Sequence, residues 1–75
     1  MALELRTYQQ WVDWRRAVTL AADADVEPMI REAIEAVPGS AAVSHLTRAL
    51  DEYALGWSPG VHIHDAQWAH FGHAP

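Results

Sequence analysis

Apolar side chains recur every three or four positions in three successive stretches of this chain, and that spacing predicts helices that each bury one face. The clearest stretch follows Ser40, which we expect to cap a helix, and ends before Gly56, which we expect to stop it. Polar residues fall on its opposite face. Its apolar stripe consists of Val43, Leu46, Leu50, Tyr53 and Ala54, with Ala42 and Ala49 at the edge.

Two earlier stretches show the same period. The first covers about residues 3–22, and its stripe consists of Thr7, Trp11, Trp14, Val18 and Ala21. The second begins after Asp25, a suitable N-cap, tolerates Pro28 in its first turn and ends before Pro38. Its apolar side consists of Val26, Met29, Ile30, Ala33 and Val37. Together the three stretches predict three amphipathic helices.

The pattern changes at Trp57. Residues 57–60 have the composition of a turn, and residues 61–64 alternate as an extended segment does. Asp65 is placed to cap one or two helical turns that end at Phe71. We therefore predict an all-α fold, with a three-helix domain over residues 1–56 and an irregular C-terminal extension over residues 57–75. This aromatic and histidine-rich extension docks on the domain or on a partner.

The charge balance argues against nucleic-acid and anionic-membrane partners. The chain has 75 residues, with 5 arginines, no lysine and 10 acids, which gives a formal net charge of −5. Binding to phosphates needs a basic surface. No apolar run approaches the ~20 residues that span a bilayer, and residues 1–6 do not resemble a signal peptide. We expect a cytoplasmic protein, or one that enters a particle assembled in the cytoplasm.

Four tryptophans are many for a core this small. Trp11 and Trp14 suit the core of the first helix, and a hot spot for a partner is the alternative. Trp57, Trp68 and Phe71 lie outside the three stripes. We expect these three to anchor a contact, either with the domain or with another chain, because large aromatic surfaces are costly to leave in water.

Four of the five histidines lie in the extension, and they raise the question of a metal or pH-sensing site. His62 and His64 share one side of an extended segment, whereas His70 and His73 are neighbours on a helical turn. Neutral imidazoles suit zinc. However, the chain has no cysteine, and Asp65 is the one carboxylate nearby. We expect no metal and no cofactor, and keep these four histidines as the candidate ligands.

Two other local patterns resemble known motifs, but a plainer explanation fits each of them better. The break at residues 37–40 between two helices has the outline of a helix-turn-helix motif. Its exposed face would be acidic, since it consists of Ser44, His45, Thr47, Arg48, Asp51 and Glu52. Residues 23–27 begin like a calcium loop. Pro28 and Ile34 then stand where that loop needs Gly and Glu, so helix capping is preferred.

Nothing in the sequence indicates catalysis. Its serines lie in no nucleophile elbow, and its four glycines are too scattered to form a phosphate loop. We predict a non-catalytic protein–protein interaction subunit that binds a protein partner or its own copies. A small structural or assembly component fits best, such as a virion component or an accessory subunit. The alternatives are a helix-turn-helix regulator and a histidine-based metal- or pH-responsive module.

Overall fold

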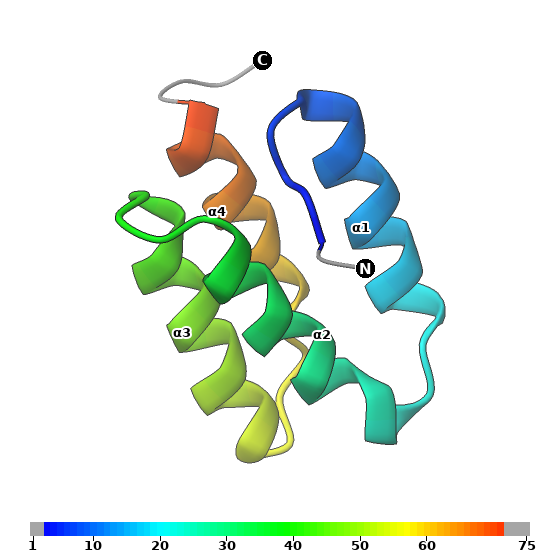
Figure 1. Ribbon diagram of the computed structural model, residues 1–75. Helices are drawn as coiled ribbons and strands as arrows, with labels where there is room; N and C mark the ends of the chain where they lie inside the picture. Colours follow the sequence, from blue (N-terminus) through cyan, green and yellow to red (C-terminus); the bar gives the residue numbers. More distant parts are fainter. Residues whose placement is uncertain (1–2, 72–75) are drawn as a thin grey trace.

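The structure, a computed structural model, describes residues 3–71 of the chain. This part of the chain contains four α-helices (Figure 1). They are α1 (Tyr8–Leu20), α2 (Asp23–Ala36), α3 (Ala42–Ala54) and α4 (Gly60–Phe71). The all-α class is confirmed. The prediction of three helices and an irregular extension is wrong, because residues 60–71 form a regular fourth helix.

The first helix begins later than its apolar stripe suggests. Thr7 accepts a hydrogen bond from the Gln10 backbone N–H at 3.2 Å, and the Gln10 side chain accepts one from the Thr7 backbone N–H at 2.9 Å. This reciprocal capping box fixes the start of α1. Residues 3–6 are not helical and run back alongside α1 (Figure 1). There Leu5 is buried, and its carbonyl accepts a hydrogen bond from Trp11 Nε1 at 3.1 Å.

The second helix also differs at its start. It begins at Asp23 rather than after Asp25, so both aspartates lie in its first turn, where the helix dipole favours negative charge. Pro28 is therefore inside the helix. At the other end, Gly39 adopts φ +78°, which turns the chain towards α3. The N-cap position of α3 is Ala41, one residue after the predicted cap, although Ser40 Oγ accepts a hydrogen bond from the Ala42 N–H at 3.1 Å.

The third helix ends in a Schellman motif. The N–H of Gly56 donates to the Tyr53 carbonyl at 3.0 Å, and the N–H of Trp57 donates to the Glu52 carbonyl at 2.9 Å. Gly56 has φ +90°, a conformation that other residues rarely adopt. The stop predicted at this glycine is confirmed, and the motif sends the chain back along α3 as α4.

The fourth helix forms because its buried positions have helical spacing. Ile63, Ala66 and Gln67 are three and four residues apart, and all three are buried. The alternation of residues 61–64 suggested an extended segment, because a run of four residues fits both periods. The helix starts five residues before the predicted cap at Asp65 and continues through Phe71.

The helices form a ring around one core. α3 packs against α2 and α4, and α4 also packs on α1, which closes the ring (Figure 1). α3 and α4 run antiparallel, joined by the short turn after Gly56. No helix between residues 3 and 71 is long and apolar enough to cross a membrane.

Most residues of the three predicted apolar stripes are buried or half-buried in the core. In α3 the fully buried side differs from the predicted stripe. In α3, Leu46 is fully buried, as predicted, and so are Ala42 and Ala49 from the edge of the stripe. The larger members of the stripe pack partly buried around them; these are Val43, Leu50 and Tyr53. The buried side chains from all four helices are Trp11, Trp14, Val18, Val26, Ile30, Ala33, Leu46, Ile63 and Ala66, among others.

Candidate interaction surface

The fourth helix has two different faces. Its inner face, made by Ile63, Ala66 and Gln67, is buried against the other helices. On the opposite side, four residues at positions i, i+3, i+4 and i+7 are open to solvent. We call this set the outer face of α4: Val61, His64, Asp65 and Trp68. Sequence reasoning missed this grouping, although its helical spacing is readable once the segment is taken as a helix.

Apolar surface is concentrated on and beside this outer face. Val61 is 70% exposed and Trp68 is 39% exposed. The turn that leads into α4 adds Leu55 at 75% and Trp57 at 65%. Single exposed apolar residues are ordinary, whereas four of the six exposed large apolar side chains of residues 3–71 fall within residues 55–68.

The five aromatic residues that the sequence predicts to bind a partner differ in their exposure to solvent. Trp57 and Trp68 are exposed. Trp11 and Trp14 are buried and meet edge to face, with ring centroids 5.8 Å apart. Phe71 packs partly buried on the core. Partner binding by Trp11 or Trp14 would require the core to open, so Trp57 and Trp68 are the better candidates for a contact surface.

Trp68 is held in place by a histidine of the same face. The rings of His64 and Trp68 lie 4.8 Å apart between centroids, one helical turn from each other. Asp65 lies beside them, with its Oδ1 3.9 Å from His64 Nδ1. The outer face therefore presents one aliphatic side chain, one indole and, between them, an imidazole next to a carboxylate.

Two of the other histidines, His62 and His70, contact neighbouring parts of the fold. His62 Nε2 contacts Glu52 Oε2, which links α4 to α3. His70 Nδ1 and Ser40 Oγ are 2.8 Å apart in a hydrogen bond, and the His70 ring packs on Trp11 with centroids 5.2 Å apart. Each of these histidines thus has a partner of its own in the fold.

The metal-site candidates are consequently not brought together. Because residues 60–64 are helical, His62 and His64 point to different sides rather than to the same side. Within residues 3–71 no three His, Asp or Glu side chains are grouped as a metal site would need. His73, the fourth candidate, lies outside the described residues.

A buried polar contact joins the first and last helices. Arg15 Nη1 donates a hydrogen bond to Gln67 Oε1 at 2.7 Å, and Gln67 is fully buried. Arg15 is half-buried. Burying an amide is costly unless it is hydrogen-bonded, so this contact offsets part of the cost of packing Gln67 between α4 and α1; the Gln67 Nε2 is buried without a hydrogen-bond partner among residues 3–71. It offers no nucleophile or acid–base pair, and its role is structural.

The α2–turn–α3 segment carries little positive charge. Arg48 is exposed on α3, with Asp51 exposed on the same helix. On α2, Arg31 is occupied by Glu27, with Nη2 and Oε1 2.9 Å apart. The face that a helix-turn-helix protein would turn towards DNA therefore carries no excess of positive charge.

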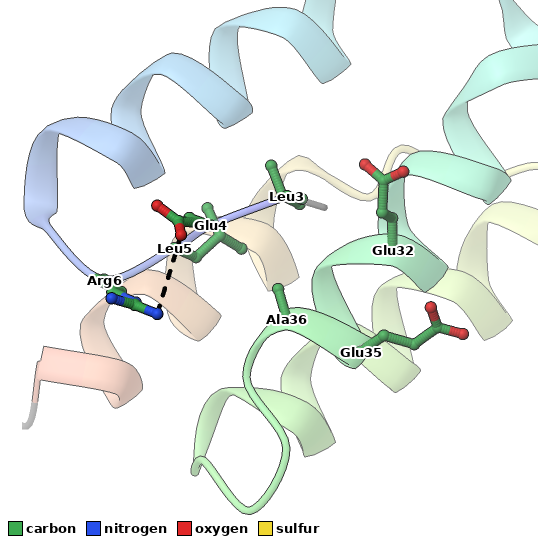
Figure 2. Close-up of a pocket in the computed structure, with 7 residues that line it drawn as sticks. All are labelled: Leu3, Glu4, Leu5, Arg6, Glu32, Glu35 and Ala36. Carbon is green, nitrogen blue, oxygen red and sulfur yellow. Dashed lines mark ion pairs between the residues drawn. The ribbon is translucent and has the colours of Figure 1, made fainter. Parts of the chain in front are cut away.

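An open hollow lies between residues 3–6 and α2 (Figure 2). Glu4, Glu32 and Glu35 line it together with Arg6, and Arg6 Nη2 is 3.8 Å from Glu4 Oε1. The side chains of Glu32 and Glu35 project outward from α2 in Figure 2. Exposed acids of this kind are typical of a solvated surface.

Comparisons with protein-family models, with curated proteins and with solved structures found no match. In this ring of four helices, one face of the last helix belongs to the core, and the other is open to solvent and carries Val61 and Trp68.

Proposed function

We propose that this chain is a non-catalytic protein–protein interaction subunit that binds its partner through the outer face of α4 and the adjoining turn. One observation carries the proposal. Of the six large apolar side chains that are exposed among residues 3–71, four lie in this region: Leu55, Trp57, Val61 and Trp68. Trp is among the residue types most enriched at the centres of interfaces.

The charge distribution supports the same surface. Ten acids and five arginines are spread over the chain, yet Asp65 is the one Asp, Glu, Lys or Arg between residues 53 and 71. Interface centres are depleted in charged residues. The region with the most exposed apolar surface is thus also the region with the least charge, which is the combination that favours burial by another protein.

The form of this function that we propose is a small structural or assembly component. The core of the chain uses the inner faces of all four helices and leaves most of the exposed large apolar side chains of residues 3–71 on α4 and the adjoining turn, open to a neighbour. A small domain of this kind gains stability from association, because any partner that binds the folded form shifts the folding equilibrium. An accessory subunit of a larger complex would use the same surface.

The test is the native mass of the chain in extracts of its source, measured by gel filtration with light scattering. The proposal predicts a mass well above 8.4 kDa. Trp57→Ala and Val61→Glu should return the chain to the mass of a monomer. Leu20→Glu is the matched control, because Leu20 is 79% exposed but lies on α1. A monomeric mass for the unaltered chain in its source would overturn the proposal.

A further inference from the structure

We propose that the partner of the outer face of α4 is a second copy of this chain, bound with the two α4 helices antiparallel across a two-fold axis. The inference rests on the proposed function, and it adds the identity of the partner and the register of the contact. It comes from the order of the four residues on that face, which is self-complementary when the helix is reversed.

The spacing of the face sets the register. Its residues are at positions 61, 64, 65 and 68, which are symmetric about a point midway between His64 and Asp65. When two such helices run antiparallel about that point, Val61 lies opposite Trp68 of the second copy, and His64 lies opposite Asp65. A two-fold interface of this kind makes every contact twice. The stripe spans about 10 Å of a helix that is about 18 Å long, so it lies near the middle of α4.

The polar pair at the centre is complementary in this arrangement. His64 is a hydrogen-bond donor, or a cation when protonated, and Asp65 is an acceptor. Both are open to solvent, with 42% and 48% of their side-chain surfaces exposed. Antiparallel pairing brings each imidazole to the carboxylate of the other copy, whereas a parallel arrangement in the same register brings the two carboxylates together.

The apolar pair is complementary in size. Val61 is small and mostly exposed, and Trp68 is large and oriented by the ring of His64. A fully exposed aromatic side chain presents about 150–250 Å², so the exposed part of Trp68 amounts to roughly 60–100 Å². One indole therefore supplies only a small part of the ~800 Å² per partner of a standard interface. We expect a weak, reversible association rather than a permanent dimer.

The net charge favours this face over the acidic surface of α2 for self-association. Two copies of a chain with a formal charge of −5 repel one another. The exposed carboxylates are most numerous on α2, where Glu32 and Glu35 are two of them, and Asp51 is exposed on α3. The outer face of α4 holds one acid, and the proposed register places a histidine against it.

The experiment is a charge exchange between two variants of the full chain, followed by sedimentation velocity. His64→Asp gives an outer face with two acids, and Asp65→Arg gives one with two basic groups. Each variant alone should lose self-association, with a dissociation constant raised about tenfold or more, which corresponds to ~1.4 kcal/mol. Mixed in equal amounts, they should form a heterodimer about as readily as the unaltered chain forms its dimer. In that heterodimer the new carboxylate at position 64 faces the new guanidinium at position 65, and the other pair is the original Asp65 with His64.

Controls separate this result from a loss of folding. Both substituted residues are open to solvent, and circular dichroism of each variant should match that of the unaltered chain. Leu20→Glu should leave the association unchanged. If the unaltered chain stays monomeric up to about 1 mM, the weak end of specific binding, the inference is wrong. It is also wrong if the mixture stays monomeric while the unaltered chain dimerises, since the contact would then lie elsewhere or in another register.

The two proposals fail separately. A purified chain that is monomeric at all concentrations, but has a large native mass in its source that Val61→Glu abolishes, would exclude the second copy and retain the interaction function. A monomeric mass in both settings would exclude both.

Discussion

Arg15 on α1 and Gln67 on α4 are joined by a hydrogen bond of 2.7 Å between Arg15 Nη1 and Gln67 Oε1, across 52 positions of sequence. Gln67 is the one fully buried polar side chain among residues 3–71. The contact closes the ring of helices where the last helix meets the first. The free energy of unfolding that is lost when the contact is removed measures how strongly it holds α4 against the core.

We expect Gln67→Ala to lower the free energy of unfolding by about 1–3 kcal/mol, because it leaves Arg15 without its buried acceptor. A double-mutant cycle with Arg15→Ala, measured by urea denaturation, should give a coupling energy of ~1–2 kcal/mol. Arg16→Ala is the control, since Arg16 is exposed beside it. Additive effects of the two substitutions would show that the hydrogen bond does not form in solution.

Leu46→Ala should cost about 2–5 kcal/mol, because Leu46 is fully buried in α3 and its removal leaves a cavity between helices. Leu55→Ala is the matched control and should change stability by less than ~0.5 kcal/mol, as its side chain is 75% exposed. Thermal and urea unfolding of both variants check this. Equal effects would mean that the α3 stripe faces away from the core.

Gly56→Ala should destabilise the protein by about 1–2 kcal/mol, because its φ of +90° is unfavourable for a residue with a Cβ atom. The strain is in the backbone, since a Cβ at Gly56 would meet no neighbouring atom within 4 Å. Gly60→Ala is the contrasting variant. It lies at the start of α4, where a Cβ would make only ordinary contact with Ser58 Oγ at 3.7 Å. It should be neutral, or stabilising by up to ~1 kcal/mol.

Partial burial, together with the negative charge and hydrogen bonding of Asp23, raises the pKa of the Tyr53 phenol above its ordinary value of about 10. Its hydroxyl donates to the Asp23 backbone carbonyl at 3.1 Å, which ties α3 to the start of α2. Because the pKa is higher in the folded state, this contribution to stability is present below pH ~10 and is lost as the pH rises through the folded-state value.

Absorbance titration of Tyr8→Phe, in which Tyr53 is the remaining tyrosine, checks this directly. The midpoint should be higher in the folded chain than in urea. Asp23→Asn should lower the folded midpoint, whereas Asp25→Asn, another acid in the first turn of α2, should leave it nearly unchanged. A folded midpoint equal to that of the unfolded chain would contradict the contact.

The acidic surface should keep the protein off DNA. Electrophoretic mobility of duplex DNA at low salt is expected to stay unchanged at micromolar protein, because Arg48 on α3 is accompanied by Asp51 and Glu52. A complex that is selective for sequence and weakens with salt would revive the helix-turn-helix interpretation.

The local pattern of the sequence was sufficient to predict helices α1 to α3 and the turn after α3. Periodicity located the buried residues Trp11, Ile30 and Leu46, and Gly56 was identified from its position after the last apolar residue. The start of α1 was also readable but was missed. Thr7 and Gln10 form the capping box, so Thr7 belongs to the N-cap rather than to the apolar stripe predicted for this helix.

By itself, the sequence determined the helical class, the three long amphipathic stripes and the scarcity of charge after residue 53, because these depend on spacing and composition alone. Tertiary structure decided the state of residues 60–71. Their short pattern of Val, His and Ile fits a strand or a helix equally well, and packing of Ile63, Ala66 and Gln67 against the other helices selects the helix. That selection turns Val61, His64, Asp65 and Trp68 to one side together. The proposed binding surface exists because a helix, unlike a strand, places residues seven apart on the same face.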